Sequence, residues 1–181
     1  MQPPEPPPGP LNVRIISGGQ TGVDRAALDT ALRLGLPCGG WCPRGRRAED
    51  GPIDSRYPLQ ETPWDGYPQR TEWNVRDSGA TLILTLGPYD RGTALTAEMA
   101  RRYGRPVLVV DLATNPASAD ARAWLRETGT ATLNVAGPRE SSAPGIHARA
   151  GRFLREMLAG EAGEAREAEA GNSPGLPAPE G

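Results

Sequence analysis

The chain has 181 residues with 22 acidic side chains and 20 basic ones, all of them arginine, and a formal net charge of −2. Because lysine is absent, a Schiff-base lysine and a Walker-type P-loop lysine are excluded, and arginine must make every cationic contact to an anion. No apolar stretch approaches the ~20 residues that span a bilayer, and the proline-rich start does not resemble a signal peptide. We therefore expect a cytoplasmic protein with no membrane partner.

The two ends of the chain differ in composition from the middle. Residues 1–10 include six prolines, and residues 161–181 consist mainly of Gly, Ala, Glu and Pro. Such segments bury too little apolar surface to offset the entropy lost on ordering, so we predict a disordered proline-rich tail and a disordered acidic tail around one domain at 11–160. Without the tails, which hold one arginine and six glutamates, 19 basic residues face 16 acidic ones. This mild positive charge suits a small anion and makes a nucleic-acid partner an unfavoured prediction.

A glycine-rich turn joins the first predicted strand to the first predicted helix. Residues 12–17 are typical of a short buried strand, and residues 23–34 have apolar side chains at helical spacing. Thr21 is the expected N-cap of this helix, and Gly35 is its expected left-handed C-terminal residue.

The rest of the chain alternates between predicted strands and helices. A short second strand at 36–41 precedes a long segment, 42–70, that lacks periodicity and is expected to be a functional or mobile loop. Thr93 and Asn115 are the expected N-caps of two later helices. The predicted helices are 71–78, 93–103, 115–129 and 144–158, and the predicted strands are 81–86, 107–111 and 130–135. This order predicts a single Rossmann-like three-layer α/β domain with a mostly parallel sheet and helices on both faces.

Three loops are the candidate ligand site. In open α/β sheets, ligands bind beyond the carboxyl ends of the strands, where loops lead into helices. Loops 17–22 (SGGQTG), 87–93 (GPYDRGT) and 134–142 (NVAGPRESS) follow predicted strands and are rich in glycine and short polar residues. All three are expected at the same edge of the sheet.

The first of these loops gives the strongest case for anion binding. Gly18 and Gly19 remove side chains where a ligand could approach backbone N–H groups, and the following helix directs its positive end there. Gln20 and Thr21 add side-chain donors, and Arg25 lies one turn into the helix. Close packing of strand and helix is the alternative reason for the glycines.

Other polar residues have both structural and functional readings. Glu98 either faces solvent or acts in the second loop's site. In the third loop, contact of Asn134, Arg139 and Glu140 with a ligand is favoured over a purely structural turn at Gly137 and Pro138.

His147 is expected at the surface. The arginines at 44, 46 and 47 are expected in a solvated loop or in a lid over a polyanion. Cys38 and Cys42 are expected to be reduced and structural, and no metal site is predicted.

Five motifs in the chain resemble the molybdenum cofactor carrier protein family, a circularly permuted branch of the SLOG superfamily of Rossmann-like nucleotide-ligand binding domains. The motifs lie at 17–29, 39–51, 71–78, 91–96 and 133–141, and the resemblance covers about residues 11–158. It implies a homo-oligomer, either a dimer or a tetramer, whose ligand is a nucleotide derivative or a molybdopterin-type cofactor. The predicted ligand- and phosphate-binding residues, from motif and loop together, are Ser17, Gly18, Gly19, Gln20, Thr21, Gly22, Asp24, Arg25, Arg44, Glu72, Gly92, Thr93, Thr96, Asn134, Gly137, Pro138, Arg139 and Glu140.

The leading functional hypothesis is a protein that binds a phosphate-bearing small molecule. Relatives in the superfamily cleave nucleotide N-glycosidic bonds with a P-G-G-x-G-T-x-x-E motif, but residues 87–98 here read GPYDRGTALTAE, without the paired glycines. The alternative is a nucleoside-monophosphate phosphoribohydrolase in which Asp24, Glu72 or Glu98 provides the catalytic carboxylate. A sensor domain that signals through the tails is a third reading.

Overall fold

The computed structural model describes residues 11–159, so the predictions made for the two tails concern residues outside this range. Short strands and longer helices alternate along the chain. The elements are β1 (Arg14–Ile16), α1 (Val23–Arg33), β2 (Cys38–Gly39), β3 (Trp41–Cys42), β4 (Arg47–Ala48), β5 (Gly51–Pro52), β6 (Gln60–Glu61), α2 (Tyr67–Arg76), β7 (Ala80–Thr85), α3 (Arg91–Arg102), β8 (Val107–Asp111), the 3₁₀ helix η1 (Leu112–Thr114), α4 (Ser118–Thr128), β9 (Thr132–Ala136) and α5 (Ile146–Ala159).

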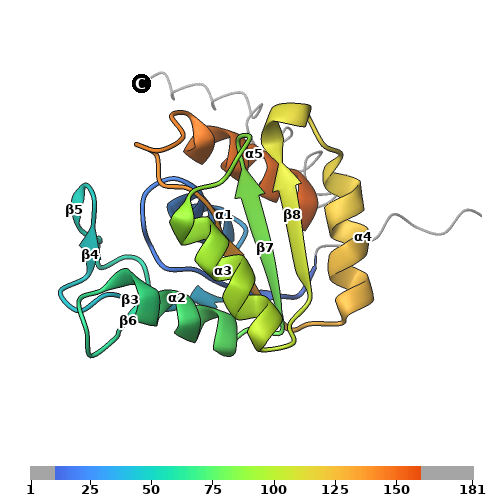
Figure 1. Ribbon diagram of the computed structural model, residues 1–181. Coiled ribbons are helices and arrows are strands. Elements are labelled where there is room, and N and C mark those ends of the chain that lie inside the picture. The colour runs from blue at the N-terminus through green and yellow to red at the C-terminus, as the bar shows by residue number, and fades with distance from the viewer. Residues whose placement is uncertain (1–10, 160–181) are drawn as a thin grey trace, which may run out of the picture.

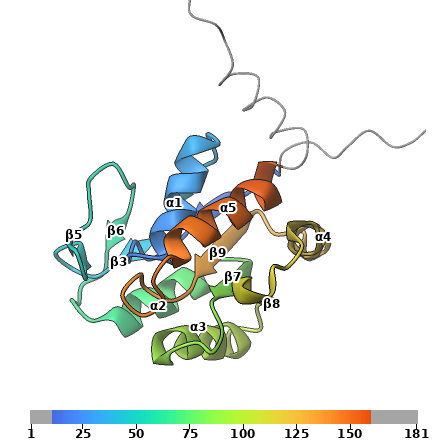
Figure 2. The ribbon, with the colours of Figure 1, turned by 90° about the horizontal axis from the view of Figure 1, so that it is seen from above.

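A five-stranded parallel sheet forms the centre of the molecule, with strand order β2-β1-β9-β7-β8. On one face α5 packs against both α1 and α4, while α2 and α3 pair on the other (Figure 1; Figure 2). The predicted Rossmann-like α/β fold with a parallel sheet and helices on both faces is therefore confirmed. No helix of residues 11–159 is long and apolar enough to cross a membrane.

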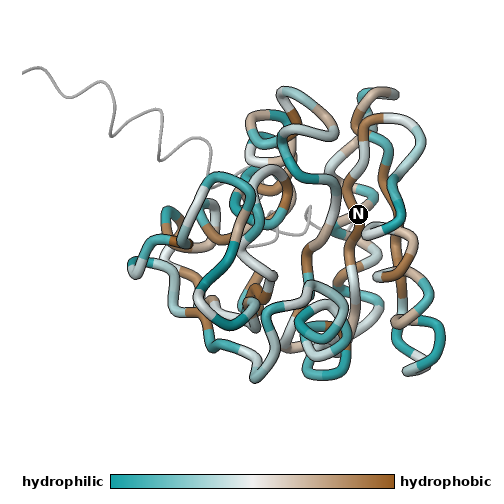
Figure 3. The backbone as a smooth tube through the Cα atoms, turned by 60° about the vertical axis from the view of Figure 1, so that its left-hand side comes forward, coloured by the Kyte–Doolittle hydropathy of each residue, from teal (hydrophilic) through white to brown (hydrophobic). Residues whose placement is uncertain are grey.

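Apolar residues fill the space between the sheet and its helices. All six residues of β7 are buried, as expected for a parallel strand that is covered on both faces. Leu82 and Leu84 of this strand pack in the main core with Leu133 of β9 and with Phe153 and Leu154 of α5. In Figure 3 the hydrophobic stretches follow these inner strands, and the outer loops are hydrophilic.

The segment 42–70 was expected to lack regular structure, but residues 41–61 form two small pairs of strands and α2 begins at Tyr67. β3 pairs with β6 in parallel, and β4 pairs with β5 as an antiparallel hairpin. Arg46, in the left-handed region at φ 52°, donates hydrogen bonds to the carbonyl groups of four residues of the segment, so it organises the loop rather than facing solvent. Ile53 and Leu59 pack in a second apolar cluster with Cys42 beneath the segment. Strands of two residues have too few positions to show a period, which is why the sequence pattern did not reveal them.

All three predicted N-caps, Thr21, Thr93 and Asn115, are wrong. Helix α1 begins after Gly22 with no side-chain cap. Asp90 caps α3 by accepting a hydrogen bond from the backbone N–H of Thr93 at 2.9 Å. Asn115 has φ 50° and ends η1, a conformation that asparagine tolerates, and α4 begins only at Ser118. Helix α2 also starts before the predicted residue 71, with a proline in its first turn.

Candidate functional site

The first and third candidate loops meet at the carboxyl edge of the sheet, because β1 and β9 are neighbours. The Ser17 hydroxyl donates to the carbonyl of Val135 at 2.7 Å, and the backbone N–H of Glu140 donates to Thr21 Oγ1 at 3.2 Å. At Gly22, an added Cβ would lie 2.4 Å from the carbonyl oxygen of Pro138. The predicted convergence of these two loops is thus present in the structure.

The two glycines of the first loop are buried against protein. A Cβ at Gly18 would lie 2.0 Å from Arg70 Nη1, and a Cβ at Gly19 would lie 2.5 Å from Leu59 Cδ1. Gly137 of the third loop is equally confined, because an added Cβ would lie 2.3 Å from the carbonyl oxygen of Leu84. Close packing therefore accounts for all three glycines.

Beneath the first loop lies a buried ion pair. Arg70 Nη1 is 3.0 Å from Asp24 Oδ2, and the two side chains are only 14% and 3% exposed. Burial raises the pKa of Asp24, while the charge of Arg70 and the backbone N–H of Gln20 act in the opposite direction. The Asp24 carboxylate thus stabilises the turn from the side of the loop that faces the protein interior.

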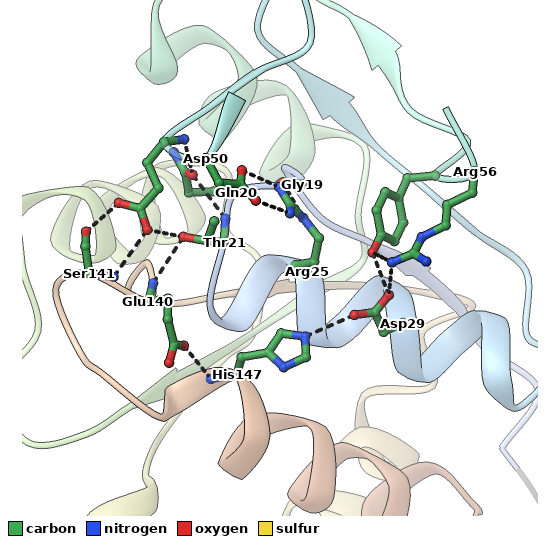
Figure 4. Close-up of polar contacts among 12 residues, drawn as sticks. Gly19, Gln20, Thr21, Arg25, Asp29, Asp50, Arg56, Glu140, Ser141 and His147 are labelled. Carbon is green, nitrogen blue, oxygen red and sulfur yellow. Dashed lines mark hydrogen bonds and ion pairs between the residues drawn. The ribbon is translucent and has the colours of Figure 1, made fainter. Parts of the chain in front are cut away.

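Glu49, in the tip of the β4–β5 hairpin, contacts both loops, and Figure 4 shows its partners Thr21 and Ser141. Its carboxylate accepts hydrogen bonds from the Thr21 hydroxyl and from the hydroxyl and backbone N–H of Ser141, the latter at 3.2 Å. Arg139 Nη1 lies 3.9 Å away. Burial acts to raise the pKa of Glu49, but the hydrogen bonds from Ser141 and Thr21 and the charge of Arg139 outweigh it and lower the pKa.

Gln20 and Arg25 complete the contacts of this hairpin. The carboxamide oxygen of Gln20 accepts from the backbone N–H groups of Thr21 and Glu49, at 3.0 and 2.9 Å. Arg25 forms a two-pronged pair with the carboxylate of Asp50, at 2.7 and 3.1 Å, and also donates to the carbonyl of Gly19. The hydrogen bond from Arg25 lowers the pKa of Asp50.

An open cleft of about 560 Å³ lies beside the first turns of α1. Asp29 is the centre of a polar network on its wall: Tyr57 donates to one carboxylate oxygen at 2.6 Å, His147 Nε2 lies 3.0 Å from the other, and Arg56 lies 3.5 Å away. The lining residues are Thr21, Gly22, Arg25, Asp29, Asp50, Pro52, Asp54, Arg56, Tyr57, Glu140 and His147.

Sequence reasoning did not select Asp29, Tyr57 or Asp50 for the site. A usable signal existed for Asp29, because it follows Arg25 by four residues and must share its face of the helix. No comparable signal connects residues 50 and 57 with α1, because the contacts depend on how the irregular segment folds back. His147 is at the surface, as predicted, and its partner across the α1–α5 groove is Asp29.

The second loop contributes the first turn of α3, where Thr93 lies. Its side chain is buried, and within residues 11–159 the Thr93 hydroxyl and Gln20 Nε2 are buried polar atoms that have no hydrogen-bond partner. Thr96 donates back to the carbonyl of Gly92 inside the helix. Asn134 lies within the sheet, where its amide donates to the Thr81 hydroxyl at 3.4 Å.

The remaining candidates occupy separate environments. Glu72 accepts a hydrogen bond from the Tyr103 hydroxyl at 2.8 Å, whereas Glu98 and Arg44 are exposed. Glu140 caps α5 by accepting from the backbone N–H groups of residues 145 and 147. Asp24, Glu72 and Glu98, the three candidate catalytic carboxylates, therefore differ in burial and in partner.

Both cysteines are free thiols. Cys42 is buried and Cys38 is half-buried. Burial raises the pKa of each thiol. In the part of the chain that the structure describes, no three His, Cys, Asp or Glu side chains come together as metal ligands.

Comparison with known proteins identifies a family model and a similar solved structure. The model of the circularly permuted YpsA SLOG family matches residues 15–158. The chain is 43% identical to a protein of Syntrophus aciditrophicus SB named "putative molybdenum carrier protein", whose crystal structure gives a TM-score of 0.79. The alignment covers 84% of this chain and 98% of that one. No curated protein matches the chain significantly.

Proposed function

Because the chain belongs to the circularly permuted YpsA SLOG family, we propose that it binds a phosphate-bearing small molecule at the carboxyl edge of its sheet. A nucleotide derivative or a molybdopterin-type cofactor is the ligand class that fits. The role of a molybdenum cofactor carrier is part of this proposal and is supported by the printed name of the similar solved structure. A cytoplasmic location and a homo-oligomeric state remain predictions.

Two of the buried polar atoms that have no hydrogen-bond partner in the described part of the chain, Gln20 Nε2 and Thr93 Oγ1, carry the proposal. Gln20 Nε2 and Thr93 Oγ1 belong to side chains that are 5% and 2% exposed, and neither has a partner among residues 11–159. A buried polar group left unpaired costs about 1–3 kcal/mol. They follow β1 and β7, which flank β9, so roughly 10 Å of sheet edge lies between these strands. A polar ligand seated there would supply the missing hydrogen-bond partners.

Charge and helix geometry favour an anionic group on this ligand. Arg25 and Arg139 lie beside the amino end of α1, where the helix dipole also attracts negative charge. Thr21 and Ser141 place hydroxyl donors between them. Phosphate accepts several such charge-assisted hydrogen bonds at once.

Substitution of Thr93 by valine tests the proposal. We expect at least about a tenfold loss of affinity for 5′-GMP or another phosphate-bearing ligand, since about 1.4 kcal/mol corresponds to tenfold. The stability of the free protein should be unchanged or slightly higher, because valine has the shape of threonine without the unpaired hydroxyl. Isothermal titration and thermal denaturation measure the two quantities.

Thr71→Val is the matched control, because Thr71 is also a buried threonine of a helix and its hydroxyl already donates to the carbonyl of Tyr67. It should leave the affinity unchanged. Equal affinities in the wild type and in Thr93→Val would remove the second loop from the proposed site.

A further inference from the structure

We propose that the tip of the β4–β5 hairpin, residues 48–51, is a latch, in which the Glu49 carboxylate occupies a subsite for a phosphate group and is displaced when the ligand binds. This inference rests on the proposed function, and it specifies where the phosphate binds and what competes with it. The latch is defined by Glu49 and Asp50 and is kept closed by contacts to the loops after β1 and β9.

The groups around Glu49 form a convergent set of oxyanion donors. Two hydroxyls, from Thr21 and Ser141, and one backbone N–H, from Ser141, all donate to this single carboxylate. The Arg139 guanidinium lies 3.9 Å from it. Thr21 and Ser141 belong to two loops and are 120 positions apart in sequence, so the fold itself brings these donors together. A phosphate group has more acceptor sites than a carboxylate and can use the same donors.

The second carboxylate of the latch neutralises the neighbouring cation. The Asp50 carboxylate accepts hydrogen bonds from Nη1 and Nη2 of the Arg25 guanidinium, at 2.7 and 3.1 Å. This bidentate geometry is the one that arginine also offers to phosphate. In the closed latch, Glu49 and Asp50 therefore satisfy donors and charge that would otherwise face the cleft.

The latch is part of a small hairpin that is not part of the central sheet. β4 and β5 have two residues each, and they pair with each other as a separate two-stranded sheet. The hairpin projects from the body of the molecule (Figure 1). Glu49 and Asp50 themselves lie in the turn between the two strands. Movement of the tip would thus break the contacts just described and little of the main core.

Opening the latch would connect the cleft with the unpartnered amide of Gln20. Thr21, Arg25 and Asp50 line the open cleft. The carboxamide oxygen of Gln20 accepts a hydrogen bond from the backbone N–H of Glu49 at 2.9 Å. Departure of Glu49 would free the carboxamide of Gln20 from this contact and leave the Thr21 and Ser141 donors open to a ligand.

The test compares Glu49→Ala with the wild type by isothermal titration with inorganic phosphate and, separately, with 5′-GMP. We expect Glu49→Ala to bind both probes at least about tenfold more tightly, because the competing carboxylate is gone. The control is Asp65→Asn, which also removes one negative charge from the 42–66 segment but has an exposed side chain paired with Arg47. It should bind as the wild type does.

Each other outcome has a defined meaning. Weaker binding by Glu49→Ala would overturn the latch and make Glu49 a ligand contact, and equal binding would overturn it by showing no competition. If neither protein binds any phosphate-bearing probe, the proposed function and the latch both fail. If the wild type binds and the variant gains nothing, only the latch fails.

Hydrogen exchange gives a second, independent measure. A saturating concentration of 5′-GMP should accelerate amide exchange at residues 46–52 of the wild type, because the displaced tip loses its contacts. Slower exchange there would mean that the ligand tightens the hairpin, and would contradict the latch.

Discussion

Replacement of Arg70 by methionine should destabilise the protein by about 3–5 kcal/mol, because it leaves the buried Asp24 carboxylate without its partner. The two side chains are 3.0 Å apart and almost fully buried, and Asp24 lies beneath the loop that starts the site. Burial already raises the pKa of Asp24, and loss of the Arg70 charge, which lowers it, would raise this pKa further. The deficit of Arg70→Met should therefore shrink as the pH is lowered and Asp24 becomes neutral.

Urea denaturation at pH 7 and near pH 4 measures both effects. The double variant Asp24→Asn/Arg70→Met removes the unpaired charge and should regain most of the lost stability at pH 7. A single variant as stable as the wild type, or a deficit that grows as the pH falls, would show that the pair does not hold the loop.

Gly22→Ala should cost about 3 kcal/mol or more and displace the third loop. Gly22 has φ 76° and ψ −128°, a conformation that costs other residues about 1–3 kcal/mol. Its added Cβ would also lie 2.4 Å from the Pro138 carbonyl and 2.8 Å from the Glu140 amide nitrogen, both backbone atoms that do not yield as a flexible side chain would. The contact of Glu140 with Thr21 should be lost as well.

Gly35→Ala separates steric crowding from backbone strain. Gly35 also has a positive φ, 67°, but nothing lies within 4 Å of its Cβ position. It should lose only about 1–2 kcal/mol, the ordinary cost of a left-handed residue. Thermal and urea denaturation of both variants give the comparison, and equal losses would mean that the close approach of the first and third loops has been misjudged.

The sequence predicted the fold well where a hydrophobic pattern extends over several residues and packing permits few arrangements of the resulting elements. The buried apolar run of β7 and the amphipathic spacing of α5 extend over several residues, and alternation of such elements permits few arrangements other than a parallel sheet covered by helices. The same rule placed the loops after β1 and β9 at the same edge of the sheet. Gly35 was identified as a helix end because a left-handed conformation suits glycine, and its φ is 67°.

The sequence was least informative where contacts depend on how an irregular segment folds back. Glu49 lies 28 residues from Thr21 and 92 from Ser141, so no local spacing indicates that they touch. Arg46 looked like a neighbour of two other exposed arginines, yet its guanidinium binds carbonyl groups of its own segment. The N-cap of α3 was assigned to Thr93 because threonine is a common cap, and the nearby Asp90 takes that role through a carboxylate.

The choice of catalytic carboxylates illustrates the same limit. Asp24, Glu72 and Glu98 were selected by motif, but motifs do not report burial or pairing. The structure gives Asp24 a buried partner and Glu72 a hydrogen bond from Tyr103, and it places Asp29 and His147 together on the cleft instead.

Native mass spectrometry of the gently purified protein, before and after incubation with the small-molecule fraction of a cell extract, tests the central claim most directly. We expect an added mass that contains phosphorus, that dissociates on denaturation, and that is reduced in Thr93→Val but retained in Thr71→Val. A wild-type protein whose mass equals that of its chain under all these conditions, or an adduct retained equally by both variants, would contradict it.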